Sequence, residues 1–151
     1  MQSPSALTIK STFGLAKVLV STVEIHDPRT SISVTLNAIW DTGATGTVIT
    51  KNISNRLGLI PTGKSNVSTA NGTVIQNTYI VSVALPNGVK IDGVVVTEVD
   101  GLSGGCDALI GMDIISLGDF SITNHNNTTC MSFRIPSIHE IDYVKTPGLK
   151  I

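Results

Sequence analysis

The chain has 151 residues, a formal net charge of −1 and only 14% charged residues. This length suits one domain with its own core, and so weak a charge gives no electrostatic basis for a nucleic-acid or membrane partner. Because its apolar runs are far shorter than a membrane-spanning helix and its first residues lack a signal-peptide pattern, we expect a cytoplasmic protein.

The first predicted elements are two strands joined by a turn. Residues 15–25 are rich in Val, and the turn-forming sequence Asp27-Pro28-Arg29 follows them. Apolar and polar residues alternate through residues 31–40, which indicates a strand with one buried face. We expect these two strands to form a hairpin.

A short helix and further hairpins are predicted next. Thr50 lies at the N-cap position of the helix, and Gly58 ends it. Strands then flank a turn at Asn71-Gly72, and another strand covers residues 89–96.

The last third of the chain is predicted to hold a brief strand, a small helix and a hairpin. Residues 107–110 are apolar enough for a strand, and residues 113–117 favour a short helix. The hairpin pairs residues 120–123 with residues 129–135 across an Asn-rich turn.

These elements predict an all-β single domain, barrel-like or built from a folded sheet, with one or two short helices. We expect an N-terminal arm over residues 1–14, the domain over residues 15–135 and a C-terminal tail over residues 136–151. The sequence contains no internal repeat, so any site that the chain builds occurs once per chain.

Three segments carry the chemistry. In residues 39–44, Ile-Trp-Asp-Thr-Gly-Ala, an apolar strand runs directly into the acid Asp41 and a glycine. An acid at the end of a buried strand is costly unless it is used or satisfied, and glycine lets the backbone turn tightly. In residues 108–113, Ala-Leu-Ile-Gly-Met-Asp, an apolar strand again meets a glycine and then an acid, and residues 68–72, Ser-Thr-Ala-Asn-Gly, are typical of a hairpin tip.

In this order the three segments resemble the retropepsin-like aspartic peptidases, which include retroviral, retrotransposon and DNA-damage-inducible ubiquitin-receptor proteases. The resemblance covers residues 15–135 of the chain. It implies the retropepsin-like acid-protease fold, a symmetric homodimer, and an aspartic endopeptidase that hydrolyses extended peptides without a metal or organic cofactor.

The resemblance also assigns roles to residues. Asp41 would be the catalytic aspartate, Thr42 would brace the two active-site loops across the dimer axis, and Gly43 would let these loops pack closely. Residues 109–111 would match the apolar-apolar-Gly segment beside the active-site loop. The implied substrate-binding residues are Ala44, Thr69, Ala70, Asn71, Gly72 and Ile110, of which residues 70–72 would form the tip of a mobile flap.

One Asp41 per chain is insufficient for this chemistry. Peptide hydrolysis needs a base to activate water and an acid to protonate the scissile carbonyl, and two carboxylates about 3 Å apart supply both by sharing a proton. A chain with one such motif must pair with its own copy about a two-fold axis.

The sequence departs from the retroviral pattern at one pair of positions. Retroviral relatives usually carry an acid soon after the motif and an arginine after the later glycine that pairs with it. Thr45, Gly46 and Met112 occupy these positions here. Gly-Met-Asp is nearer to the retrotransposon and ubiquitin-receptor branch.

Several residues have simpler structural interpretations. Asp41 could cap a turn, Asn71-Gly72 could be an ordinary type I′ hairpin turn, and Asp113 is better explained as a helix cap or hydrogen-bond partner than as a second catalytic acid. The chain as a whole could also be a dimeric scaffold or binding module on the same fold whose catalysis is lost or latent.

Two other kinds of site are disfavoured. Residues 101–105 match the nucleophile elbow of serine hydrolases around Ser103, but that pattern needs a preceding strand, a following helix and a large parallel sheet. His125 and Cys130 have no partners at zinc-finger spacing. Cys106 and Cys130 are expected to be reduced thiols.

Overall fold

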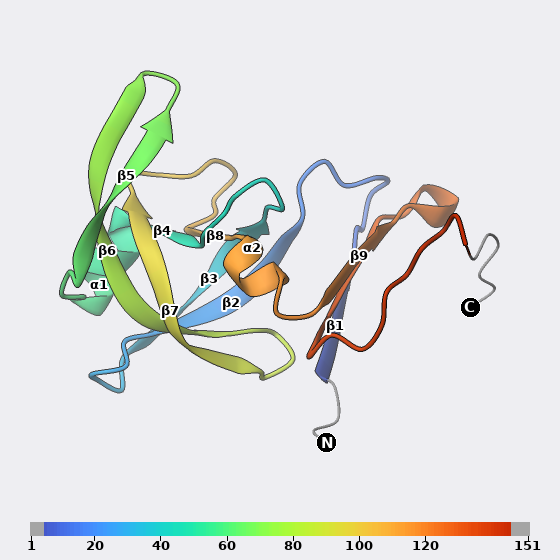
Figure 1. Cartoon of the computed structure of the whole chain (residues 1–151), viewed down its shortest axis with the longest axis horizontal. Coiled ribbons are helices and arrows are strands. Elements are labelled where there is room, and N and C mark those ends of the chain that lie inside the picture. Colours follow the sequence, from blue (N-terminus) through green and yellow to red (C-terminus); the bar gives the residue numbers. More distant parts are fainter. Residues whose placement is uncertain (1–4, 146–151) are drawn as a thin grey trace.

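The computed structural model describes residues 5–145 as two β-sheets with two short α-helices (Figure 1). The strands are β1 (Ser5–Lys10), β2 (Val20–His26), β3 (Ser33–Trp40), β4 (Val48–Thr50), β5 (Gly63–Thr69), β6 (Gly72–Ala84), β7 (Lys90–Val99), β8 (Ala108–Ile110), β9 (Asp119–Thr123) and β10 (Cys130–Ile135). The helices are α1 (Lys51–Leu57) and α2 (Met112–Ile115), and the 3-10 turn η1 (His125–Asn127) joins β9 to β10. No helix in residues 5–145 is both long and apolar enough to span a membrane.

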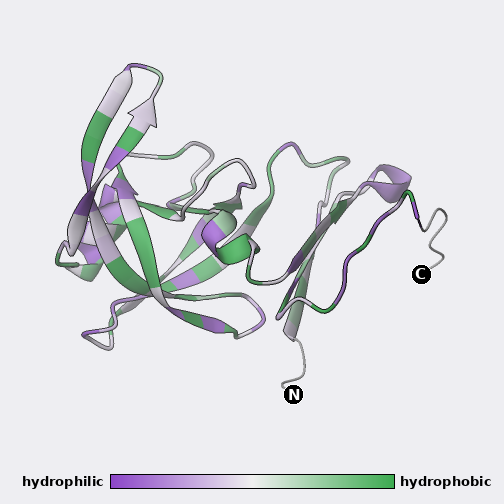
Figure 2. Ribbon diagram, in the orientation of Figure 1, coloured by the Kyte–Doolittle hydropathy of each residue, from purple (hydrophilic) through white to green (hydrophobic). Residues whose placement is uncertain are grey.

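The larger sheet has seven strands in the order β2-β3-β8-β4-β7-β6-β5 and closes on itself through an additional β2–β6 pairing. The predicted β2–β3 hairpin forms, with Val23 opposite Leu36. The antiparallel β5–β6 and β6–β7 pairs form as predicted too. Apolar and polar bands alternate along β6 and β7 (Figure 2), so the closed sheet encloses an apolar interior.

The core lies inside this closed sheet, beneath α1, and between the two sheets. Its largest fully buried side chains are Phe133, Ile25, Ile49, Ile53, Ile110, Ile114, Met131, Val23, Val81, Val83 and Val96. Burial of side chains of this size, each worth about 1.5–3 kcal/mol, holds the two sheets and α1 together.

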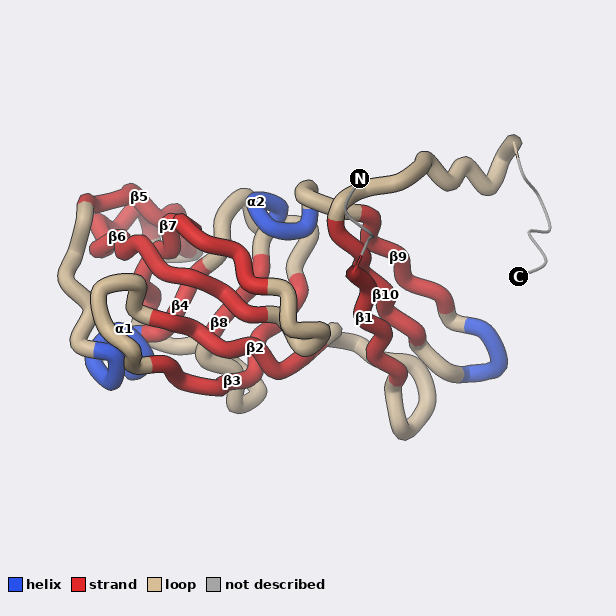
Figure 3. The backbone as a smooth tube through the Cα atoms, turned by 90° about the horizontal axis from the view of Figure 1, so that it is seen from below, coloured by secondary structure: helices blue, strands red, loops and turns tan. Residues whose placement is uncertain are grey.

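The smaller sheet has the order β1-β10-β9 and stands beside the larger one, with α2 near the junction (Figures 1 and 3). Trp40, the last residue of β3, joins the two sheets. Its ring stacks on Phe120 of β9, with ring centroids 5.8 Å apart, and lies 5.3 Å from the ring of Phe133 of β10. Its indole N–H donates to the Ser21 hydroxyl at 2.8 Å. The residue before Asp41 is therefore fixed by both sheets.

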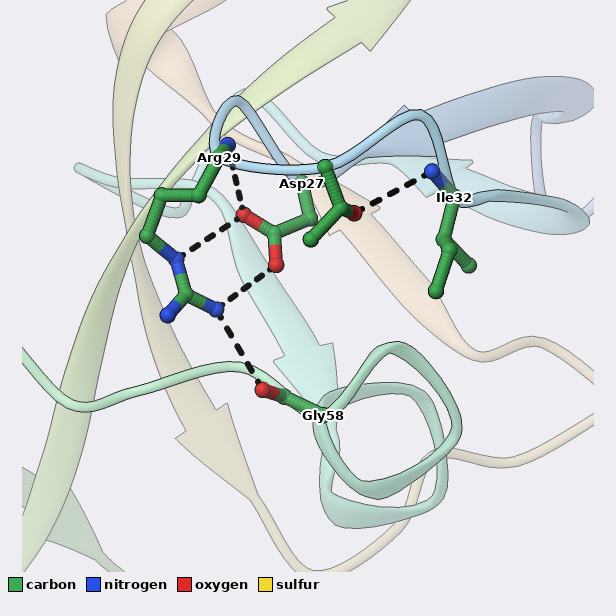
Figure 4. A network of polar contacts seen from close by, with 5 residues as sticks. Asp27, Arg29, Ile32 and Gly58 are labelled. Carbon is green, nitrogen blue, oxygen red and sulfur yellow. Dashed lines mark hydrogen bonds and ion pairs between the residues drawn. The ribbon is translucent and has the colours of Figure 1, made fainter.

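Helix α1 begins and ends where the sequence predicts, and the β2–β3 turn holds its end. Gly58 adopts the left-handed conformation (φ 62°) that ends the helix. The Arg29 guanidinium donates to the Gly58 carbonyl at 3.3 Å and to both carboxylate oxygens of buried Asp27 (Figure 4). The bonds from Arg29 hold the pKa of Asp27 below its usual value.

A buried carboxylate joins α1 to strands β6 and β7 of the larger sheet. Glu98 of β7 accepts the Tyr79 hydroxyl of β6 at 2.7 Å and the Ser54 hydroxyl of α1. All three residues are buried, and burial together with the contact to Glu98 raises the pKa of Tyr79. This network satisfies an acid that the alternating pattern of β7 places inside the barrel.

Asp119, the first residue of β9, fastens the segment that follows β10. Its carboxylate accepts the Ser137 hydroxyl at 2.5 Å, the Ile138 N–H at 2.9 Å and the Arg134 Nε at 2.7 Å. These bonds, the one from Ser137 foremost, hold the pKa of Asp119 well below its usual range. The tail is thus tied back onto the smaller sheet as far as Ile138.

The structure differs from the predicted elements at several boundaries. Residues 5–10, inside the expected arm, form β1, and residues 15–19, expected to be strand, form a loop. β3 begins at Ser33. Ile32 lies in the preceding turn, where its N–H donates to the Thr30 hydroxyl at 3.1 Å and the residue is exposed. Residues 1–4 of the expected arm and 146–151 of the expected tail lie outside the described residues.

Candidate active site

Asp41 follows β3 directly, at the point where β3 runs parallel to β8. Its backbone N–H donates to the Ile110 carbonyl at 2.9 Å, which extends the β3–β8 pairing by one bond. A parallel neighbour thereby fixes the backbone of the acid, so the position of Asp41 follows from the sheet.

The Asp41 carboxylate is held by the glycine two residues later. The Gly43 N–H donates to Asp41 Oδ1 at 2.8 Å, and the Ala44 N–H donates to the Asp41 carbonyl at 3.3 Å. A Cβ atom on Gly43 would lie 3.1 Å from Asp41 Oδ1. Asp41 and Ala44 are half-buried, whereas Thr42 and Gly43 are exposed. One oxygen of Asp41 thus caps a turn, as the structural interpretation expects, and the side chain is still accessible to solvent.

The segment after β8 supports the loop of residues 41–47, which we call the Asp41 loop. The Met112 N–H donates to the Ala44 carbonyl at 2.8 Å. A Cβ atom on Gly111 would lie 2.6 Å from both the carbonyl carbon and the oxygen of Gly46. Only glycine lets the two backbones approach this closely. The structure therefore brings together the first two segments that the sequence singles out.

Asp113 and Thr47 form a contact that sequence reasoning did not find. Asp113 accepts the Thr47 N–H at 3.0 Å and the Thr47 hydroxyl at 2.8 Å. The N-cap position of α2 is held by Gly111, so of the two structural interpretations of Asp113 the hydrogen-bond partner is the correct one. These residues lie 66 positions apart, and no local pattern joins them.

The β5–β6 hairpin, which carries the expected flap residues, projects from the body on the same side as the Asp41 loop (Figure 1). Thr69 pairs with Gly72, so the two-residue turn is Ala70-Asn71 and lies one position earlier than predicted. Positive φ falls on Gly72 (118°), not on Asn71, which does not fit the type I′ turn. The Thr69 hydroxyl closes the turn by donating to the Gly72 carbonyl at 2.7 Å.

The other implied substrate-binding residues differ in exposure. Ala70, Asn71 and Gly72 are exposed at the hairpin tip, and among the hydrogen bonds of residues 5–145 none joins this tip to the Asp41 loop. Ile110 is fully buried. It acts on Asp41 through its backbone carbonyl, because the alternation of β8 points its side chain into the core.

The disfavoured sites find no support in the geometry. Ser103 lies in the loop between β7 and β8, and a strand rather than a helix follows it. Within residues 5–145, no group of three or more His, Cys, Asp or Glu side chains is placed to hold a metal ion.

Residues 30–116 match the family described as "gag-polyprotein putative aspartyl protease". The matched range is more than half of the chain and contains both the Asp41 loop and the segment after β8. The chain belongs to this aspartyl protease family. No curated protein sequence matches this chain.

Solved structures resemble this chain in fold. The EIAV protease complexed with the inhibitor HBY-793 is 25% identical, with a TM-score of 0.52, and the match covers 70% of this chain and 92% of that one. A retropepsin-like aspartic protease from Rickettsia conorii is 14% identical, with a TM-score of 0.53, and the match covers 89% of this chain and 97% of that one. These likenesses confirm the mostly β, retropepsin-like fold that the sequence predicts.

Proposed function

We propose that this aspartyl protease is an endopeptidase in which Asp41 of two copies forms one catalytic pair. The observation that carries the proposal is the arrangement of Asp41 itself. One carboxylate oxygen is fixed by the Gly43 N–H, the backbone is fixed by the Ile110 carbonyl, and the half-buried side chain still meets solvent. A reacting carboxylate needs this combination of fixed direction and open access.

The mechanism follows from pairing two such carboxylates about a two-fold axis. One carboxylate takes a proton from a water molecule while the other, protonated, donates to the carbonyl oxygen of the scissile bond. The attack gives a tetrahedral diol. In its collapse, the carboxyl group that took the proton from water gives it to the leaving nitrogen, the other carboxylate takes a proton back from a diol hydroxyl, and the C–N bond breaks to release an amine and a carboxylic acid. Because the mechanism needs one carboxyl group protonated and the other ionised, activity is expected to favour mildly acidic pH.

An exposed apolar loop beside the site supports association with a second copy. In the β1–β2 loop, Phe13 is 96% exposed, Leu15 53% and Val18 55%. The end of this loop lies beside the site: the Leu19 carbonyl accepts the N–H of Trp40, the residue before Asp41, at 2.9 Å. The loop also projects to the same side as the Asp41 loop (Figure 1). A two-fold axis brings the same surface patch of two copies together, so an apolar patch near that axis would be buried against its own copy.

The proposed substrate is an extended polypeptide lying between the Asp41 loop and the β5–β6 hairpin. Backbone groups of a strand-like peptide would bond to the hairpin, with side chains in alternating pockets. The likeness to an inhibitor-bound EIAV protease supports a groove of this kind. Thr42 is proposed to brace the two Asp41 loops against each other. Cys106 and Cys130 are free thiols, which suits a reducing, cytoplasmic setting.

The test is peptide-library cleavage from pH 4 to 7 by the wild-type chain and by Asp41→Asn. Asp92→Asn is the matched control, because it also turns a carboxylate into an amide, on β7, where its side chain is 76% exposed. Dimer content of each protein is measured by analytical ultracentrifugation at the assay concentration.

The expected result is cleavage by the wild type and by Asp92→Asn, and none by Asp41→Asn. Cleavage that survives in Asp41→Asn would contradict the carboxylate-pair mechanism. A confirmed wild-type dimer that cleaves nothing would favour a dimeric binding or scaffold module on this fold.

A further inference from the structure

We propose that Asp113 is a positioning residue for catalysis, which holds the far end of the Asp41 loop through Thr47. This inference rests on the proposed endopeptidase function and adds a residue to it. Asp113 lies on α2, outside the three-residue motif that carries the catalytic acid.

The contact uses both oxygens of the Asp113 carboxylate. Oδ1 accepts the Thr47 hydroxyl at 2.8 Å, and Oδ2 accepts the Thr47 N–H at 3.0 Å. Oδ1 also accepts the N–H of its own neighbour, Ile114, at 2.9 Å. Hydrogen bonds to an ionised acceptor are about twice as strong as neutral ones. A carboxylate therefore binds this end of the Asp41 loop more strongly than a neutral acceptor would.

Thr47 passes the contact on to the backbone beside the site. Thr47 is buried, with 1% of its surface exposed, and its hydroxyl oxygen accepts the Gly111 N–H at 3.2 Å. The hydroxyl thus donates to Asp113 and accepts from Gly111 at once, which uses its donor. Without Asp113, the Thr47 N–H and hydroxyl proton would be left buried without this acceptor, which is unfavourable.

The bonds from one short segment hold the Asp41 loop at its start, middle and end. The Ile110 carbonyl accepts the Asp41 N–H at the start, and the Met112 N–H donates to the Ala44 carbonyl in the middle. Asp113 holds Thr47 at the end. The first two contacts are made by backbone groups, so Asp113 is the one of these supports that a side-chain change can remove.

A merely structural Asp113 and a positioning Asp113 differ in what its loss changes. A structural residue lowers stability and the amount of folded dimer, with the turnover of each remaining dimer unchanged. A positioning residue lowers kcat per dimer, because a displacement of about 1 Å at a reacting group costs about 100-fold in rate. KM changes little, since the substrate groove is formed by other residues.

The experiment measures kcat and KM per dimer for Asp113→Ala and Asp113→Asn on one peptide that the wild type cleaves. The assay temperature is well below each melting temperature, and dimer content comes from analytical ultracentrifugation. Asp92→Ala is the matched control, because Asp92 also accepts a hydroxyl, from Ser82 at 2.6 Å, on β7. We expect kcat to fall about 100-fold for Asp113→Ala and by less for Asp113→Asn, whose amide keeps one acceptor oxygen.

Variants of Thr47 test the same contact from the loop side. Thr47→Val removes the hydroxyl with little change in shape and is expected to lower kcat. Thr47→Ser keeps the hydroxyl and is expected to keep kcat near the wild-type value. If Asp113→Ala fails to fold, Thr47→Val against Thr47→Ser decides the question. The double variant Thr47→Val/Asp113→Asn is expected to lose less than the product of the two single losses, because both remove one contact.

Unchanged kcat per dimer in Asp113→Ala, or in Thr47→Val, would overturn the inference and leave the proposed function standing. Activity that survives in Asp41→Asn, or a wild-type dimer without activity, would instead remove the proposed function and this inference with it.

Discussion

The contact between Gly111 and Gly46 gives the sharpest prediction, because two similar substitutions should have opposite effects. An alanine Cβ at position 111 would lie 2.6 Å from the Gly46 carbonyl carbon and oxygen, whereas one at position 46 meets nothing within 4 Å. Ordinary carbon contacts lie about 3.5–4.0 Å apart, so the overlap at Gly111 is about 1 Å.

The magnitude comes from separating steric cost from chain entropy. Gly111 has φ −97° and ψ −173°, and Gly46 is not among the positive-φ glycines, so alanine suits both backbones. Each substitution gains about 0.4–1 kcal/mol by restricting the unfolded chain. Because this gain is common to both, the difference between the variants isolates the steric cost, which is about 1–3 kcal/mol for overpacking.

The assay is urea unfolding of Gly111→Ala, Gly46→Ala and the wild type at one protein concentration, since the proposed dimer would make stability concentration-dependent. Thermal unfolding should follow, at about 2–4 °C per kcal/mol for a chain of this length. We expect Gly46→Ala to be at least as stable as the wild type and Gly111→Ala to be the least stable of the three. Equal stability of the two variants would refute the close approach of these backbones.

Two further predictions concern the smaller sheet and the exposed loop. The first is Asp119→Asn. Because the pKa of Asp119 is depressed in the folded protein, its carboxylate stabilises the fold above the unfolded pKa of about 3.9, and this stabilisation is lost as pH falls through the folded pKa. The loss of unfolding free energy should therefore be largest at pH 7 and shrink below about pH 3.9 in urea titrations, and a loss that is constant down to pH 3 would contradict the contact with Ser137. For Phe13→Ser, removal of an exposed aromatic side chain should raise the dissociation constant of the proposed dimer about tenfold, with monomer stability unchanged. Sedimentation beside the control Val144→Ser, which changes another exposed apolar residue (89%), measures this, and an unchanged constant would count against the loop as interface.

The hairpins and the first helix could be predicted because their signals are local. Alternation defines β3, and the turn residues after β2 and around Asn71 mark where chains reverse. Even there, the turn of the β5–β6 hairpin lies one residue earlier than predicted, since Gly72 takes the positive φ while remaining paired with Thr69. Local patterns thus give the elements and leave their exact bounds to packing.

The contacts that build the site could not be predicted in this way. The parallel pairing of β3 with β8 joins Trp40 to Ile110, and the Thr47–Asp113 contact spans 66 positions. Each depends on which segments the closed sheet brings together. Glu98 illustrates the same limit, because an acid in a strand is usually exposed, and here two hydroxyls from other elements make its burial possible. The family resemblance predicted that residues 109–111 lie beside the active-site loop, and the structure supplied the bonds that hold them there.

The pairing of β1 with β10 has a consequence for the folding of the smaller sheet. Ser5 lies opposite Ile135, so the first described strand finds its partner only once the last strand is available. Of the strand pairings in residues 5–145, this one joins the residues farthest apart in the sequence, and forming it carries the highest loop-closure entropy. A substitution that weakened it would loosen the smaller sheet first, and with it the stacking on Trp40 that holds the residue beside Asp41.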